Sequence, residues 1–150
     1  MNKPILAVMV GISGSGKSTF CSGLKTSLNA ELVETDAIRV ELTGNAEDQS
    51  QNARVLFCVA RRRVDNLLSQ GKNTVIDATS VSVRDRKDWI DIAKKNNAEV
   101  RAYFVDTPID VAKQRNRKRD RKVPEDVIDR QASRLQPPTK SEGFDLVVVI

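Results

Sequence analysis

The feature that most constrains the fold is the glycine-rich segment 11–18, which reads GISGSGKS. It matches the pattern G-x-x-x-x-G-K-[ST], in which backbone N–H groups surround phosphate oxygens. An apolar run at residues 5–10 ends directly before it, and a helix-forming run at residues 17–28 follows it. Strand, glycine loop and helix form the context of a true phosphate-binding loop. The alternative is a chance glycine-rich turn.

Strand-like and helix-like patterns alternate along the rest of the chain. β-rich or apolar runs predict strands at residues 31–35, 74–77, 100–105 and 146–150, the last of them buried. Helical spacing predicts helices at residues 36–42, 51–70, 83–96, from Pro108 onward and at 124–135, with a loop at 45–50. This alternation predicts an α/β fold with a mostly parallel sheet of about five strands flanked by helices. We expect a single domain spanning residues 1–150, since no long linker interrupts the chain.

Residues suited to phosphoryl transfer follow the predicted strands. Gly11, Asp36, Asp77 and Asp106 all fall at the carboxyl ends, where sheets of this kind bind ligands. Glycines let the loop close around phosphates, Lys17 neutralises β/γ-phosphate charge, and the Ser18 hydroxyl reaches Mg²⁺. The sequence therefore predicts ATP and Mg²⁺ as cofactors. The predicted nucleotide-binding residues in this segment are Ser13, Gly14, Ser15, Gly16, Lys17, Ser18 and Thr19.

The chain contains no histidine, so a general base has to be a carboxylate, a lysine or something rarer. Asp36 is the best-placed carboxylate, and Arg39 shares its helix face one turn later. The alternative is an N-cap aspartate followed by a surface arginine. Asp77 is predicted to order either the water bound to Mg²⁺ or the phosphate-loop hydroxyl. The alternative is a turn residue at the end of the strand.

A basic segment follows the fourth predicted strand. Its cations are Lys113, Arg115, Arg117, Lys118, Arg119, Arg121 and Lys122, with Asp120 as the one acid between Arg115 and Lys122. In many nucleotide kinases a mobile lid at this position closes arginines over the triphosphate. The sequence predicts such a lid at about residues 113–124, and the alternative is a solvated helix face.

The whole-chain properties limit the class of protein. The formal charge of +5 favours a polyanionic partner. No apolar run reaches the roughly 18 residues of a membrane span, and the first ten residues lack the features of a signal peptide, so a cytoplasmic location is predicted. Cys21 and Cys58 are predicted to be buried free thiols, and Trp89 to pack a helix onto the sheet.

On these motifs the chain resembles the kinase domain of the 5′-polynucleotide kinase family, within the P-loop kinase superfamily. The family includes the phage enzymes and the kinase module of bacterial RNA end-healing enzymes. The resemblance rests on residues 11–19, 35–39, 48–50, 77–80, 115–124 and 142–144. Ser80 stands where the family commonly has asparagine, and the lid is shorter near Asp120.

The resemblance implies roles for individual residues. It makes Asp36 the general base on the 5′-hydroxyl of RNA or DNA, and Arg39 a contact to the acceptor nucleotide. It makes Arg115, Arg119 and Arg121 contacts to the ATP phosphates, with Lys17 and Arg119 stabilising charge during transfer. Thr79 and Val123 are expected to lie against the acceptor. Separate phosphatase and ligase partners are expected for nucleic acid end repair.

Two other functions remain open from the sequence. A small-molecule or nucleoside kinase of the same fold would use the same loop, base and lid. A nucleotide-dependent nucleic-acid-binding module would need the loop but neither base nor lid.

Overall fold

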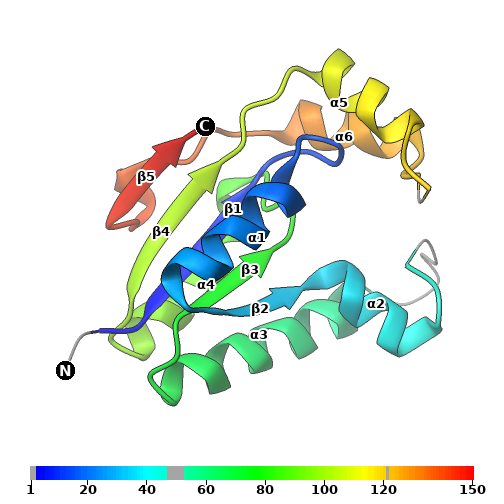
Figure 1. The fold of residues 1–150 in the computed structure, drawn as a ribbon. Helices are drawn as coiled ribbons and strands as arrows, with labels where there is room; N and C mark the ends of the chain where they lie inside the picture. Colours follow the sequence, from blue (N-terminus) through cyan, green and yellow to red (C-terminus); the bar gives the residue numbers. More distant parts are fainter. Residues whose placement is uncertain (1–2, 47–52, 121) are drawn as a thin grey trace.

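The computed structural model describes residues 3–46, 53–120 and 122–150 (Figure 1). Its strands and helices alternate as the sequence predicts. They are β1 (Ile5–Val10), α1 (Lys17–Leu28), β2 (Glu31–Glu34), α2 (Thr35–Thr43), α3 (Ala53–Ser69), β3 (Thr74–Asp77), α4 (Val83–Lys95), β4 (Glu99–Phe104), α5 (Ile109–Arg117), α6 (Glu125–Arg134), the 3-10 helix η1 (Lys140–Glu142) and β5 (Leu146–Val149).

The strands form one five-stranded sheet in the order β2-β3-β1-β4-β5, and every neighbouring pair is parallel. The predicted α/β fold is therefore confirmed. β1 lies in the centre, with β3 and β2 on one side of it and β4 and β5 on the other. In open parallel sheets, ligands bind beyond the carboxyl ends of the strands where the strand order reverses in this way. The segment that follows β1 is the glycine loop.

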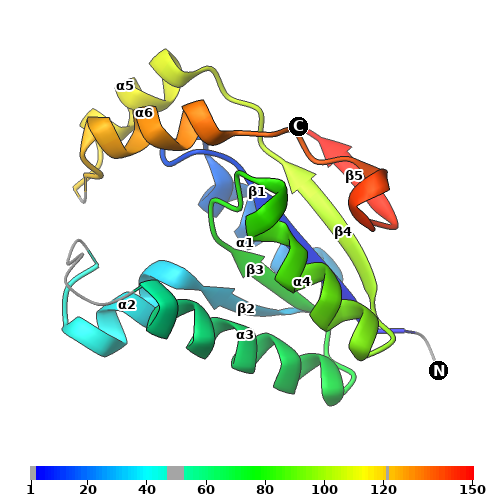
Figure 2. The same cartoon turned by 180° about the vertical axis from the view of Figure 1, so that it is seen from behind.

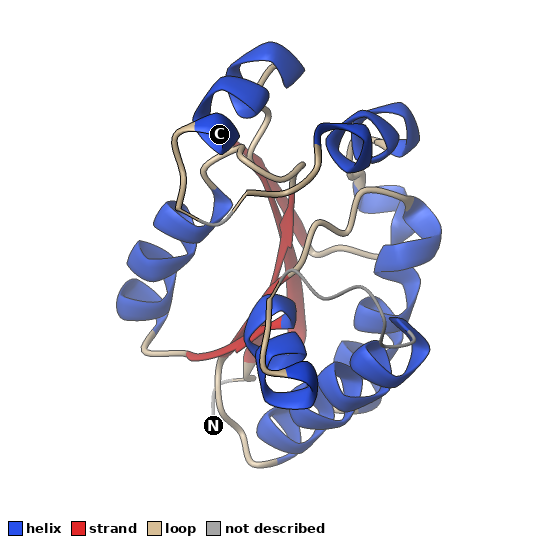
Figure 3. Cartoon of the chain, turned by 90° about the vertical axis from the view of Figure 1, so that its right-hand side faces the viewer, coloured by secondary structure: helices blue, strands red, loops and turns tan. Residues whose placement is uncertain are grey.

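Helices cover both faces of the sheet (Figure 3). The side chains of β1 alternate between these faces, as they do in any strand. Leu6 and Val8 pack in a core with α3 and α4, while Ala7 and Met9 pack in a second core with α1. Figures 1 and 2 accordingly show α1 on one face and α3 with α4 on the other. Two fully buried faces explain why the β1 sequence is a continuous apolar run.

Element boundaries differ from the predicted ones at a few positions. Thr35 begins α2 instead of ending β2. Pro108 and Pro124 are the N-cap residues of α5 and α6, one position before the first helical turn, because each lies in an extended conformation. Gly44 ends α2 with φ of 79°, the left-handed stop that the sequence predicts. The predicted loop at 45–50 falls outside the described residues from 47 onward.

The prediction that the last strand is buried is wrong. Among the described strands β5 pairs with β4 alone and so forms an edge of the sheet. Leu146 and Val149 are 38% and 63% exposed. An apolar run predicts a strand well but does not distinguish an edge from a centre, because only the neighbouring strands decide that.

Trp89 packs α4 onto the sheet and is 2% exposed, as predicted. Cys21 is buried as expected, but Cys58 on α3 is exposed, so the prediction for that thiol is wrong. None of the helices in the described ranges is long and apolar enough to cross a membrane.

Candidate functional site

The phosphate loop is held in a form that only glycine permits at two positions. Gly14 and Gly16 have φ of 82° and 98°, in the left-handed region. A Cβ on Gly14 would lie 2.3 Å from the carbonyl oxygen of Ala112 in α5. The Gly11 amide donates to the carbonyl oxygen of Thr79 at 3.0 Å, which joins the loop to the end of β3.

The loop leads directly into α1, whose first amides have no acceptor within the helix. Together with the positive end of the helix dipole, these amides favour an anion. A loop of this shape fits the phosphates of a nucleotide.

Lys17, Ser18 and Asp77 form the polar floor of the site. The Ser18 hydroxyl donates to the Asp77 carboxylate at 3.3 Å. Burial lowers the pKa of Lys17, against the opposing effect of the negative charges on Asp77 and Asp36. Burial also raises the pKa of Asp77, although the nearby Lys17 and the hydrogen bond from Ser18 act against that rise. The charged form of each side chain is therefore stabilised by the opposite charge of the other.

The same floor is suited to a magnesium ion that arrives with a nucleotide. One hydroxyl and one carboxylate lie together, and the described residues contain no group of three His, Cys, Asp or Glu side chains that could hold a metal ion alone. Mg²⁺ is usually bound by one or two protein oxygens, with phosphates and water completing its shell. Ser18 and Asp77 fit that pattern.

Asp36 and Arg39 project from α2 on one face, as their spacing predicts. An Arg39 guanidinium nitrogen donates to a carboxylate oxygen of Asp36 at 3.2 Å. The Asp36 side chain is 43% exposed. Glu34 is the N-cap of α2, so the alternative of an N-cap aspartate is wrong, and Asp36 lies in the first helical turn. Asp36 thus remains an exposed carboxylate with a fixed cationic neighbour.

A pocket of about 480 Å³ brings the predicted site residues together. It is lined by Ser13, Gly14, Gly16, Lys17, Ser18, Thr19, Asp36, Arg39, Asp77, Thr79, Arg115, Arg119 and Val123. Ser15 is buried beneath the loop at 1% exposure and is not part of the lining. Arg121 falls outside the described residues. Segments from the ends of β1, β2 and β3 thus converge with α5 and α6 on one cavity.

The pocket has several other lining residues for which the sequence predicted no individual role in binding or catalysis. They are Thr35, Ala46, Leu56, Phe57, Ala78, Lys122, Pro124, Val127 and Gln131. Leu56 and Phe57 belong to α3, while Pro124, Val127 and Gln131 lie at or within α6. Lys122 belongs to the basic run, and Thr35, Ala78 and Pro124 lie within segments of the resemblance, whereas the others carry no motif that marks them. For Leu56, Phe57, Val127 and Gln131, the place in the pocket follows only from how α3 and α6 pack.

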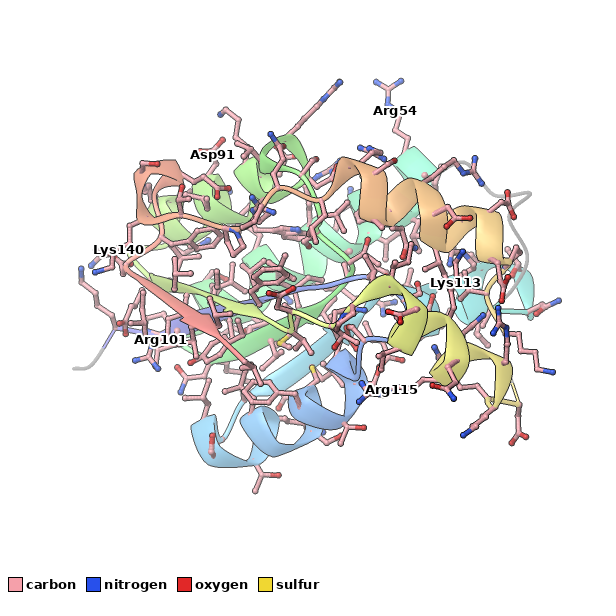
Figure 4. All side chains as sticks on the ribbon, turned by 90° about the horizontal axis from the view of Figure 1, so that it is seen from above. Arg54, Asp91, Arg101, Lys113, Arg115 and Lys140 are labelled. Carbon is pink, nitrogen blue, oxygen red and sulfur yellow. The ribbon has the colours of Figure 1, made fainter. Side chains whose placement is uncertain are left out.

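The basic segment is more ordered than a charged tail would be. α5 extends through Arg117, so Lys113 and Arg115 are helical, and Figure 4 shows both projecting from α5. Arg115 donates to the carbonyl oxygen of Ser15 at 3.0 Å, and Thr107 donates to the same oxygen at 2.8 Å. Lys113 and Arg117, which lie on either side of Arg115 in the sequence, make ion pairs with carboxylates of α6. Arg119 lines the pocket.

Asn116 holds the turn between α5 and α6. Its buried side-chain amide donates to the Val123 carbonyl oxygen at 2.7 Å and accepts from the Val123 amide at 2.9 Å. This pair of bonds fixes Val123 at the wall of the pocket.

Comparison with known families finds a match over most of the chain. Residues 6–138 match a family model described as an AAA domain. The chain belongs to this AAA domain family. Among curated relatives, the bifunctional polynucleotide phosphatase/kinase of Schizosaccharomyces pombe is 27% identical over 144 residues, which are 93% of this chain and 31% of that protein. The adenylyl-sulfate kinase of Buchnera aphidicola is 30% identical over 129 residues, which are 79% of this chain and 59% of that protein.

The solved structure of the Pnkp1/Rnl/Hen1 RNA repair complex contains a chain with a TM-score of 0.79 and 27% identity. The match covers 97% of this AAA domain chain and 47% of the other. The P-loop kinase fold and the resemblance to polynucleotide kinases are thus confirmed. The chain spans only 19% to 31% of three curated relatives named as polynucleotide kinases.

Proposed function

We propose that the chain is an ATP-dependent kinase that transfers the γ-phosphoryl group to the 5′-hydroxyl end of RNA or DNA. One observation carries this proposal: Asp36 and Arg39 line the same pocket as the phosphate loop. The loop alone would suit any nucleotide-binding protein. An exposed carboxylate with a guanidinium 3.2 Å away adds a proton acceptor and an anion-binding group beside it.

On the nucleotide side, Lys17 would neutralise charge on the β- and γ-phosphates, and Ser18 would hold Mg²⁺ with Asp77 acting through water. A Mg²⁺ ion held there would offset the negative charge that develops on the phosphates during transfer. Arg115 and Arg119, with Arg121 from the same segment, would contact the phosphates. The lid at about residues 113–124 would bring these arginines over the triphosphate.

On the acceptor side, Asp36 would accept the proton of the 5′-hydroxyl as its oxygen forms a bond to the γ-phosphorus. The bond from that phosphorus to the bridging oxygen breaks, and ADP leaves with the electron pair. Arg39 would bind a phosphate of the acceptor strand while its hydrogen bond keeps the Asp36 carboxylate in place. Thr79 and Val123 would lie against the acceptor nucleotide.

The nucleic acid acceptor is supported by the polynucleotide kinase relatives and by the net charge of +5. The names of those relatives pair the kinase with a phosphatase or an RNA ligase. We propose that separate phosphatase and ligase partners act with this chain in nucleic acid end repair.

A small-molecule kinase is the second candidate. The adenylyl-sulfate kinase relative has similar identity and a larger share of its length matched. The same loop, base and basic residues would serve a small acceptor, because fold does not determine the substrate.

The test is transfer of label from γ-labelled ATP with Mg²⁺ to a panel of acceptors. The panel contains RNA and DNA oligonucleotides with 5′-hydroxyl ends, the same strands with 5′-phosphate ends, nucleosides and adenylyl sulfate. We expect only the 5′-hydroxyl strands to be labelled. Labelling of small acceptors alone would favour the second candidate. Strand binding without transfer to any acceptor would leave a nucleic-acid-binding module.

A further inference from the structure

Gln131 of α6 contacts the phosphate loop across 118 positions of sequence. The Ser13 amide donates to Gln131 Oε1 at 2.8 Å, and Gln131 Nε2 donates to Ser13 Oγ at 3.1 Å. One side chain thus binds two polar groups of one loop residue, its backbone amide and its hydroxyl. Both residues line the pocket that contains Lys17 and Asp36.

The backbone contact fixes which way the Gln131 amide faces. A backbone N–H can only donate, so the group facing it has to be the carbonyl oxygen of Gln131. The NH₂ group then faces Ser13 Oγ, which accepts from it. A serine hydroxyl has a single proton, and here that proton has to point away from Gln131. Ser13 Oγ donates to no acceptor among the residues that the structure describes.

Ser13 lies at the end of the loop that is nearer to α6, three residues before the cap of α1. The amides at the start of α1 suit an inner phosphate, which leaves the outer end of a triphosphate to the earlier part of the loop. A hydroxyl donor held in advance at that position would stabilise charge on the group in transfer without reorganising.

We propose that Ser13 donates a hydrogen bond to the terminal phosphoryl group of the bound nucleotide, and that Gln131 is the positioning residue that directs it. This inference rests on the proposed function only in taking the nucleotide to be a triphosphate. It makes α6 part of nucleotide recognition, although no nucleotide-binding motif lies in that helix.

A purely structural tether between α6 and the loop predicts something different. Arg115 and Thr107 already hold the neighbouring Ser15 carbonyl. If Gln131 only adds to that anchoring, its loss would weaken binding of every nucleotide equally. If it directs a donor to the terminal phosphoryl group, its loss weakens ATP binding and leaves ADP binding unchanged.

The experiment measures the affinity of ADP and of a non-hydrolysable ATP analogue, with Mg²⁺ and without any acceptor. The variants are Ser13→Ala, Gln131→Met and the double variant. Because a hydrogen bond to a charged group is lost, we expect Ser13→Ala to weaken binding of the ATP analogue by about ten- to a hundred-fold and to leave ADP binding unchanged. Gln131→Met should weaken ATP-analogue binding by a smaller factor, and its effect should shrink once Ser13 is alanine, because only its bond to the Ser13 amide is then left to lose.

Two control variants make the result specific. Ser13→Thr keeps the hydroxyl and should retain the preference for the ATP analogue. Gln136→Met removes another glutamine side chain that accepts a backbone amide, that of Val83 at 2.9 Å, outside the pocket. It should change neither affinity. Equal weakening of both nucleotides, or no change in Ser13→Ala, would overturn the inference. Because no acceptor is present, failure of the proposed acceptor does not affect this result.

Discussion

The two cysteines have opposite environments, since Cys21 is buried and Cys58 is exposed. Burial, with the negative charges of Asp77 and Glu34, raises the pKa of the Cys21 thiol to about 12. Cys58 is exposed on α3. Helical spacing alone would have assigned Cys58 to neither face with certainty, since it lies between the buried Leu56 and Ala60. Only the packing of α3 shows which way it points.

We therefore predict selective modification of Cys58. The thiolate is the reactive form of a cysteine. The Cys21 side chain is buried, and pH 7.5 lies far below its pKa, so Cys21 stays a protonated thiol. Mass spectrometry after maleimide treatment of the native protein should find one label, which is lost in Cys58→Ser. Unfolded protein should take two. A label on Cys21 in the native protein would contradict its burial.

Gly14 and Gly23 give a matched pair of glycine substitutions. Gly14→Ala would force a Cβ to within 2.3 Å of the Ala112 carbonyl oxygen at a φ of 82°. Gly23 lies within α1, and apart from its own helix backbone and chain neighbours no described atom lies within 4 Å of its Cβ position. We predict that Gly14→Ala lowers ATP affinity at least about tenfold because the loop has to move. Gly23→Ala should leave affinity unchanged and raise stability by up to about 1 kcal/mol.

Nucleotide titrations and thermal unfolding of the two variants measure both effects. Normal ATP affinity in Gly14→Ala would contradict the described contact between the loop and α5.

At the scale of elements, the buried Arg86 joins α4, η1 and the segment after β3. It makes two charge-assisted bonds to the Glu142 carboxylate, at 2.8 and 3.0 Å, and donates to the carbonyl oxygens of Ser80 and Val81. The Arg86 and Glu142 side chains are 0% and 6% exposed. This ion pair therefore supports the backbone next to Thr79, at the rim of the pocket.

We predict that Arg86→Ala destabilises the protein by about 3–5 kcal/mol, because Glu142 is left buried without its partner. Arg117→Ala removes an exposed partner of Glu125 and should cost less than about 1 kcal/mol. Denaturant unfolding of both variants provides the comparison. Similar small losses in the two would mean that the buried pair contributes little.

The element order was predictable because periodicity is a local property. β1 and α1 have the predicted bounds, since an apolar run and a glycine loop leave little choice. The interaction of Arg86 with Glu142 was not predictable, because a charged residue within α4 carries no sign of burial. The exposure of β5 was missed for a similar reason, since an apolar strand acquires its neighbours only in the assembled sheet.

At the scale of the whole molecule, the candidate site was largely predictable, because strand ends of a parallel sheet meet at one edge. Asp36 is far in sequence from Asp77 and Thr79, yet the three lie at or just after the ends of β2 and β3, which are neighbours. Gln131 and Phe57 could not be predicted in the pocket, because the packing of whole helices brings them there. That these two side chains face the pocket is known only from the folded structure.

We propose Asp36 as the base toward a 5′-hydroxyl strand. The most direct test compares wild type with Asp36→Asn in transfer of label from γ-labelled ATP to a 5′-hydroxyl oligonucleotide, alongside their affinities for a non-hydrolysable ATP analogue. We predict that the variant binds the analogue normally and transfers label about 10²- to 10⁴-fold more slowly. Transfer at the wild-type rate by the variant would contradict the claim.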